Sequence, residues 1–221
     1  RCVGREGTMR SSPIATAWLM LASIILGVAG CLLLLAPDSR ADVDARWPDV
    51  VHYVDSDDDD TMMLMIVATI QSAVDMFPEL AGITFTTAPQ DNGEYAVAYG
   101  RTVELAERWA SDPAGLDVAM RNDVAAGFHP PLGRCQPVQF LILHEVAHVL
   151  DNVHGRTGRT ALTLAAAGMD AEDLRVARKS LSRYSFGGDG RLNPGEALAE
   201  AWAATVCQSA TNLEEELAGL I

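Results

Sequence analysis

The most marked hydrophobic feature of the chain is an uncharged run near its N-terminus, Ala17–Ala36. A helix of that length is about 30 Å long, which matches the hydrocarbon core of a membrane. Arginines precede the run and acidic residues follow it, a pattern that predicts a cytoplasmic N-terminus and export of the rest. We therefore expect residues 1–41 to be a signal peptide or membrane anchor, followed by an acidic linker over residues 42–60.

Three fates of this N-terminal segment stay open. The small residues of Ser39-Arg40-Ala41 are suited to signal cleavage, whereas the length of the run suits an uncleaved anchor. Val28-Ala29-Gly30-Cys31 resembles a lipoprotein box, in which Cys31 would be lipidated. Each fate predicts a secreted or membrane-anchored protein whose folded domain is extracytoplasmic, with membrane contact only through the N-terminal helix.

Hydrophobic periodicity over residues 61–221 predicts an α-rich domain with a few strands. Helical spacing and residues typical of helix starts, such as Asp112-Pro113 and Asn193-Pro194, define the helices, and alternation defines the strands. The segment Arg101–Ala110 fits either type. The predicted fold class is α+β. The predicted helices are Thr61–Phe77, Asp112–Ala126, Gln139–Asn152, Thr160–Ala167, Ala171–Leu181 and Pro194–Ala210, and the predicted strands are Gly82–Thr87 and Tyr95–Tyr99.

The composition and charge of the chain indicate which classes of binding partner are excluded. The chain has 30 acidic against 16 basic residues and a net charge of −14, so we expect no nucleic-acid partner. Beyond residue 41 it has two cysteines, Cys135 and Cys207. An even pair in an exported domain predicts a disulfide.

The predicted helix Gln139–Asn152 contains the chemical signature His144-Glu145-Val146-Ala147-His148, an HExxH motif. Residues i and i+4 share one face of a helix, so both imidazoles can bind one metal ion, most typically zinc. Glu145 is then placed to take a proton from water. A catalytic zinc site needs a third protein ligand. The residues offer four: His154, Glu196, Glu200 and Asp151.

The motif and its downstream context resemble a known family. His-Glu-Val-Ala-His-Val-Leu-Asp, then Ser182-Arg183-Tyr184 and Asn193-Pro194-Gly195-Glu196-Ala197-Leu198-Ala199-Glu200, are similar to the catalytic domain of anthrax lethal factor and the Pro-Pro endopeptidases. The resemblance covers residues 143–203. It implies a zincin-like fold and an HExxH zinc metallopeptidase of the gluzincin type. It also implies that Glu196 is the third zinc ligand and that Glu200 is a carboxylate that supports the site. Tyr184 would donate a hydrogen bond to the oxyanion, and Asp151 corresponds to the aspartate that the family has three residues after the second histidine.

The sequence therefore predicts an exported zinc endopeptidase that cleaves peptides or proteins, with Glu145 as general base. A strand within Arg101–Trp109 is expected to pair with the extended substrate. Two alternatives remain: a metzincin-like protease with His154 as third ligand, and an inactive zinc-stabilised binding domain. The remaining histidines, His52 and His129, are interpreted as ordinary surface or loop residues, with a contact between His129 and substrate near the cleft as the alternative.

Overall fold

A mixed four-stranded sheet forms one side of the domain. The computed structural model describes residues 50–53, 60–89 and 93–221, and the strand order is β1 (Val50–Tyr53), β2 (Ile83–Ala88), β4 (Thr102–Ala106) and β3 (Ala96–Tyr99). The strands β1, β2 and β4 are parallel, whereas β3 is antiparallel to β4. Strand β3 is therefore at an edge of the described sheet.

The strands agree with the alternating sequence pattern. In β2, Ile83 and Phe85 are fully buried, and the threonines between and after them are half-buried. The ambiguous segment Arg101–Ala110 divides into β4 and the short helix α4 (Glu107–Ala110), because its alternating part and its helical part follow one another. Strand β1 lies within the stretch expected to be a linker, and it pairs with β2.

The helices agree closely with the predicted spans. Of the two helix starts expected from the sequence, Asp112 caps its helix by accepting a hydrogen bond from the Gly115 N–H, whereas the Asn193 side chain forms no capping hydrogen bond. Asp170 caps a third helix by accepting from N–H groups of its first turn. Helix α9 ends four residues before the predicted end, and the last helix, α10, was not predicted. The observed spans are α3 (Asp60–Met76), α5 (Pro113–Ala125), α6 (Pro137–Val153), α7 (Thr157–Ala167), α8 (Ala171–Ser180), α9 (Pro194–Val206) and α10 (Asn212–Ala218).

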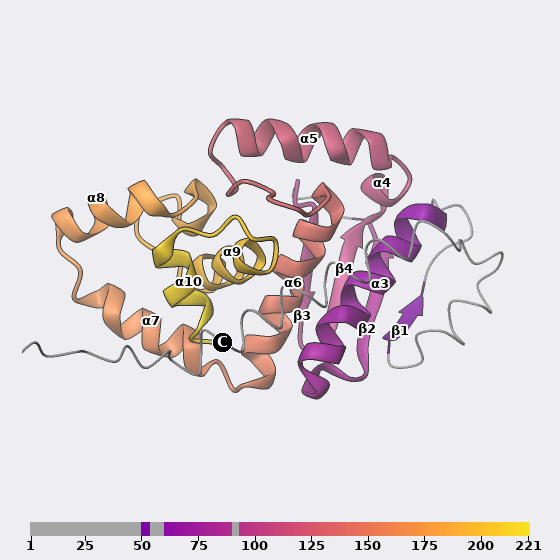
Figure 1. Cartoon of the computed structure of the whole chain (residues 1–221), viewed down its shortest axis with the longest axis horizontal. Coiled ribbons are helices and arrows are strands. Elements are labelled where there is room, and N and C mark those ends of the chain that lie inside the picture. The colour runs from indigo at the N-terminus through magenta and orange to yellow at the C-terminus, as the bar shows by residue number, and fades with distance from the viewer. Residues whose placement is uncertain (1–49, 54–59, 90–92) are drawn as a thin grey trace, which may run out of the picture. The chain divides into compact units, whose positions relative to one another are not determined.

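Helix α6 lies at the centre of the described domain, with the sheet and α3 on one side and α7–α10 on the other (Figure 1). It is buried along most of its length because apolar residues occupy nearly every position apart from the HExxH motif. Helix α9 is equally buried, and its small residues Ala197, Ala201 and Ala204 are fully inaccessible. Two buried helices can thus place polar side chains in an interior site.

A disulfide joins these two helices at their ends. Cys135, two residues before α6, is bonded to Cys207, the residue that follows α9. The Arg134 N–H also donates to the Cys207 carbonyl. The predicted disulfide and the predicted α+β class are both confirmed.

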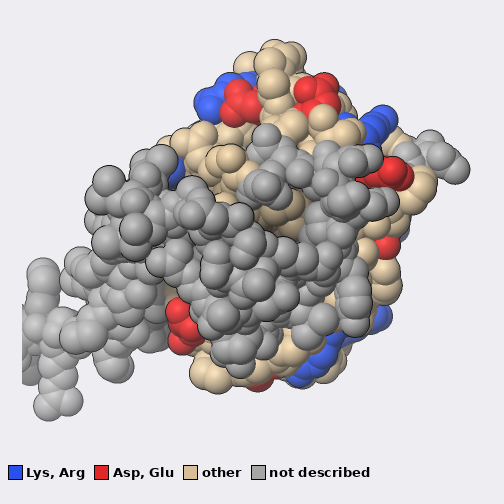
Figure 2. All heavy atoms as spheres, turned by 90° about the vertical axis from the view of Figure 1, so that its right-hand side faces the viewer, with Lys and Arg blue, Asp and Glu red and all other residues tan. Residues whose placement is uncertain are grey.

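The predicted N-terminal helix, with Cys31, and most of the expected linker lie outside the described residues. Within the described part of the chain, none of the helices combines the length and the apolar character that a membrane span requires. Figure 2 shows the sheet side of the molecule, where blue and red side chains are interspersed around the described surface.

Candidate metal centre

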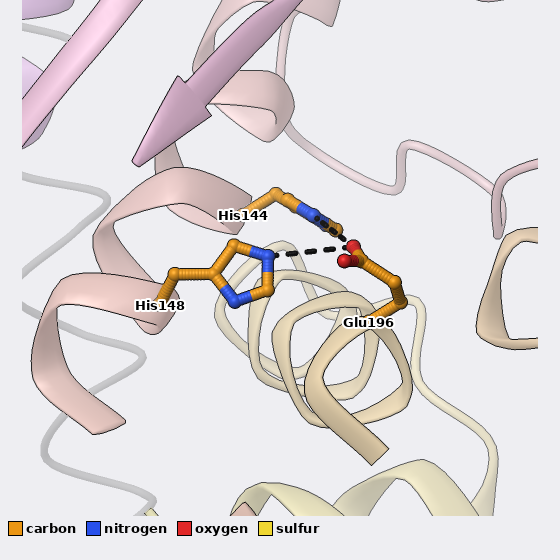
Figure 3. A group of neighbouring side chains, drawn as sticks. All are labelled: His144, His148 and Glu196. Carbon is orange, nitrogen blue, oxygen red and sulfur yellow. Dashed lines mark hydrogen bonds and ion pairs between the residues drawn. The ribbon is translucent and has the colours of Figure 1, made fainter. Parts of the chain in front are cut away.

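Three side chains from α6 and α9 converge on one point. His144 and His148 point from the same face of α6 toward Glu196, in the first turn of α9 (Figure 3). The Nε2 atoms of His144 and His148 lie 3.1 Å and 3.3 Å from the same oxygen, Oε2 of Glu196. One ligand atom from each residue lies within 4.8 Å of the others, so this group could hold a metal ion.

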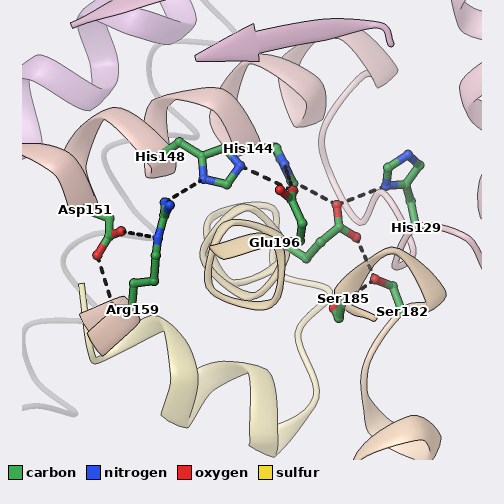
Figure 4. Close-up of polar contacts among 9 residues, drawn as sticks. His129, His144, His148, Asp151, Arg159, Ser182, Ser185 and Glu196 are labelled. Atoms are coloured by element: carbon green, nitrogen blue, oxygen red, sulfur yellow. Dashed lines mark hydrogen bonds and ion pairs between the residues drawn. The ribbon is translucent and has the colours of Figure 1, made fainter. Parts of the chain in front are cut away.

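The buried carboxylate of Glu200 lies one helical turn after Glu196 on α9 and contacts His144. Figure 4 shows the surrounding polar contacts, including those of His144, His129 and Ser182. Oε1 of Glu200 is 3.0 Å from Nδ1 of His144, a close ion-pair contact whose angle falls short of hydrogen-bond geometry. Its Oε2 accepts a 2.8 Å hydrogen bond from the Ser182 hydroxyl. The supporting position expected for Glu200 therefore agrees with its observed contacts.

His129 is the third partner of Glu200, and the sequence interpretation of it as a surface or loop residue missed this contact. It lies in the loop after α5 and is only 6% exposed, with Nδ1 at 3.0 Å from Oε1 of Glu200. Its ring packs against Tyr184 and Phe140. A histidine in a Phe-His-Pro-Pro loop has no local pattern that indicates burial, so no sequence signal identified it.

Asp151 contacts Arg159 of α7 and not the metal-binding group. Its Oδ2 accepts a 2.9 Å hydrogen bond from Nε of Arg159, and its Oδ1 accepts from the Arg159 backbone N–H. Nη2 of Arg159 lies 3.5 Å from Nδ1 of His148. Asp151 thus reaches the second histidine only through Arg159, a residue that the sequence analysis did not identify.

Glu145 and Tyr184 line the same cleft as the three ligand-type residues. The cleft has a volume of about 320 Å³ and is walled by β3, α6 and the start of α9. The ring of Tyr184, in the short 3₁₀ turn Arg183–Ser185, lies 5.6 Å from the His144 ring. Two backbone hydrogen bonds from residues 183 and 184 to the carbonyls of Gly127 and Phe128 fix this turn against the His129 loop.

The electrostatic environment sets the protonation of these groups. Burial raises the pKa of the Glu145 carboxyl, against the lowering effect of His144 and His148. Burial and the surrounding carboxylates, Glu196 first among them, raise the pKa of the Tyr184 hydroxyl, which therefore stays protonated.

The protonation states of Glu196 and His144 depend on each other. Burial alone would raise the pKa of Glu196, but hydrogen bonds from His144 and His148 outweigh it and hold that pKa far below its usual range. Burial alone would lower the pKa of His144, but contacts with Glu196 and Glu200 raise it well above 6.5. A proton on His144 therefore balances part of the negative charge of the two carboxylates.

His154 lies away from this group, at the C-terminal end of α6. Its Nδ1 is 2.6 Å from the Ile221 carbonyl oxygen, and its Nε2 is 2.9 Å from Oε1 of Glu79. The structure therefore brings together His144, His148 and Glu196, with Glu145, Tyr184 and Glu200 beside them, but not His154. Comparison with protein-family models, with curated proteins and with solved structures found no match for this chain.

Proposed function

We propose that this chain is an exported zinc-dependent endopeptidase with a zincin-like catalytic domain. One observation carries the proposal: Glu145, a buried carboxyl with no hydrogen bond or ion pair among the described residues, lines the same cleft as two histidines and a glutamate in ligand geometry. A purely structural zinc site closes all four positions with protein ligands, whereas a catalytic site keeps one open beside a general base.

The donor set fits zinc in number, type and spacing. Four tetrahedral ligands at about 2.0–2.1 Å from zinc lie about 3.3 Å from one another. The two nitrogen-to-oxygen separations at Glu196, 3.1 Å and 3.3 Å, are close to this value. Two imidazoles and one carboxylate form a ligand set typical of zinc peptidases, and Glu200 supplies the carboxylate that often accompanies a ligating histidine.

Glu145 acts as the general base in this proposal. Zinc, when bound, would lower the pKa of a coordinated water and polarise the carbonyl of the bond to be cleaved. The Glu145 carboxylate takes the proton of the attacking water and passes it to the leaving amine nitrogen. Its raised pKa suits both transfers, because a carboxyl whose pKa is shifted toward the working pH can accept a proton in one step and release it in the next.

Tyr184 and Glu200 support the reaction from opposite sides. The Tyr184 hydroxyl remains a donor at neutral pH and can hydrogen-bond the carbonyl oxygen as negative charge develops on it. The negative charge of Glu200, 3.0 Å from Nδ1 of His144, favours the tautomer with its proton on Nδ1, which leaves the lone pair of Nε2 free to bind a metal ion.

The substrate is proposed to be an extended peptide that pairs with β3, not with β4. The expectation that placed it within Arg101–Trp109 is wrong for a physical reason: β4 is hydrogen-bonded on both sides. Strand β3 has a free edge in the described sheet and lines the cleft. An unpaired edge offers main-chain groups to a peptide of any sequence.

The proposal is tested by metal analysis and hydrolysis together. Purified wild type should hold about one zinc per chain, and Glu196→Ala should hold little, whereas Glu216→Ala, at an exposed glutamate of α10, should match wild type. Glu145→Gln should keep its zinc but lose hydrolysis of a peptide library by a factor of at least about 10³.

Each alternative has its own outcome in this experiment. Zinc binding without hydrolysis by wild type would favour the inactive binding domain. Loss of zinc in His154→Gln, with zinc retained in Glu196→Ala, would favour the metzincin-like arrangement. Absence of zinc from folded wild type would refute the proposal. Export is supported by the Cys135–Cys207 disulfide, because such bonds persist in oxidising compartments.

A further inference from the structure

Arg156 is a cation in the wall of the cleft that no carboxylate of the described residues neutralises. It follows α6 and lines the cleft together with Asn152 and Arg159. Its Nε donates a 2.8 Å hydrogen bond to Oδ1 of Asn152, which is uncharged. Arg159, in contrast, forms an ion pair with Asp151. The positive charge of Arg156 therefore remains available to a ligand in the cleft.

The backbone holds Arg156 in an unusual conformation. Its φ angle is +60°, in the left-handed region that non-glycine residues seldom adopt. Its N–H donates to the Asp151 carbonyl, and its carbonyl accepts from the Thr160 N–H at the start of α7. A strained conformation held by surrounding hydrogen bonds is most frequent at functional sites.

The direction of β3 relates Arg156 to the direction of a bound peptide. The Arg101 guanidinium, just after β3, donates to the carbonyls of Glu79 and Ala81, and Glu79 pairs with His154 at the C-terminal end of α6. The C-terminal end of β3 therefore lies toward Arg156. A peptide paired antiparallel to β3, the more stable arrangement, has its N-terminal part at that end.

The distance between the cleaved bond and the peptide residue nearest Arg156 follows from the rise per residue of a helix and of an extended strand. Helix α6 continues for five residues beyond His148, a rise of about 8 Å, before the segment that holds Arg156. An extended peptide advances about 3.3 Å per residue. Arg156 is thus near the peptide residue about two to four positions before the cleaved bond.

We infer that Arg156 forms a subsite for an acidic side chain, Asp or Glu, on the N-terminal side of the cleaved bond. The inference rests on the proposed endopeptidase function and deepens it by specifying a substrate class. A guanidinium that is held by an uncharged amide and faces a cleft is suited to bind a carboxylate, because its remaining N–H donors can form a charge-assisted pair.

The test is cleavage of a randomised peptide library with blocked N- and C-termini, read by sequencing of the products. Wild type should enrich Asp and Glu about two to four residues before the cut. Replacing that acidic residue by its amide should lower kcat/KM about two- to fivefold, the range of a partly exposed ion pair. Arg156→Lys should keep the preference, and Arg156→Asn, which tolerates the positive φ, should lose it.

Reversing the charge of Arg156 is the most discriminating variant of this experiment. Arg156→Glu should change the preference at the same position from acidic to Lys or Arg. Arg134→Glu is the matched control, because it makes the same change in net charge at an exposed residue that does not line the cleft. Each variant is compared at equal zinc content, so a loss of the metal site cannot imitate a change of specificity.

The outcomes separate the two ideas. Cleavage by wild type without an acidic preference, or with a preference that Arg156→Glu leaves unchanged, would overturn the inference and leave the proposed function intact. Cleavage that requires a peptide with an unblocked C-terminal carboxylate near the cut would also overturn it, because the peptide would then run in the opposite direction and Arg156 would bind its C-terminus. Failure to cleave any library peptide with zinc bound would contradict the proposed function, and with it this inference.

Discussion

At the residue scale, Glu200 connects most of the groups that shape the candidate centre. Its carboxylate contacts Nδ1 of His144, Nδ1 of His129 and the Ser182 hydroxyl. The same His129 ring packs against Tyr184, the proposed oxyanion donor. His129 is therefore a positioning residue, since it reaches both the metal-binding group and the donor without touching the metal ion.

Replacement of His129 should weaken metal binding from a distance. His129→Leu removes one donor to a buried carboxylate, so we expect a loss of about 2 kcal/mol in the free energy of unfolding and about tenfold in zinc affinity. His129→Asn keeps an N–H donor near the position of Nδ1 and should restore most of the affinity. Chelator competition and urea unfolding measure the two quantities. Equal zinc affinity in all three proteins would show that His129 serves packing alone.

At the element scale, strand β3 presents defined main-chain groups to the cleft. Tyr95 accepts a hydrogen bond from the Ala106 N–H, and the register then pairs Val97 with Glu104 and Tyr99 with Thr102. In an antiparallel ladder hydrogen-bonded pairs alternate with unbonded ones. The N–H and C=O groups of Ala96 and Ala98 therefore point away from β4, toward the free edge.

This register predicts different effects of proline at neighbouring positions. Ala98→Pro removes an outward N–H and no sheet hydrogen bond, so the protein should fold, bind zinc and lose about tenfold in kcat/KM for peptides. Val97→Pro removes a hydrogen bond to β4 and should lower the melting temperature instead. Melting curves, zinc content and peptide kinetics separate the two. Unchanged kinetics in a folded Ala98→Pro protein would exclude substrate pairing with β3.

At the scale of the whole molecule, the proposed zinc ion would compete with protons for the same buried site. Contacts with Glu196 and Glu200 raise the pKa of His144 in the metal-free fold. A raised pKa means that the stabilisation by protonated His144 is complete below about pH 6.5 and is lost as pH rises through the folded-state pKa. Zinc binding requires that proton to leave.

The stabilisation by zinc should therefore increase with pH. We expect the difference in melting temperature between the zinc-bound and chelator-treated protein to be larger at pH 8.5 than at pH 6. The difference between the two melting temperatures is used because the effect of pH on the net charge of the chain is common to both forms and cancels. Scanning calorimetry at several pH values measures it. A difference that stays constant or shrinks over this range would contradict the assignment of His144 as a metal ligand.

The sequence by itself determined the local structure and the core of the chemistry. Hydrophobic period and capping residues depend on neighbours within a few positions, so six of the helices, two strands and the HExxH pair on one face of α6 were predictable, whereas the short helices α4 and α10 were not. The Cys135–Cys207 disulfide was predictable because these are the two cysteines beyond residue 41. The first glutamate of α9 was preferred as third ligand only through a resemblance, because spacing alone left four candidates.

Only the tertiary structure decided between those candidates and added the surrounding shell. Packing of α9 against α6 brings Glu196 to both histidines and leaves His154 with Glu79. Other tertiary contacts bury His129 beside Glu200 and pair Asp151 with Arg159. The sheet order makes β3 the edge strand of the described sheet, where it lines the cleft with Arg156. These contacts join residues distant in sequence, and their formation depends on how whole elements bury their apolar faces, which no local pattern specifies.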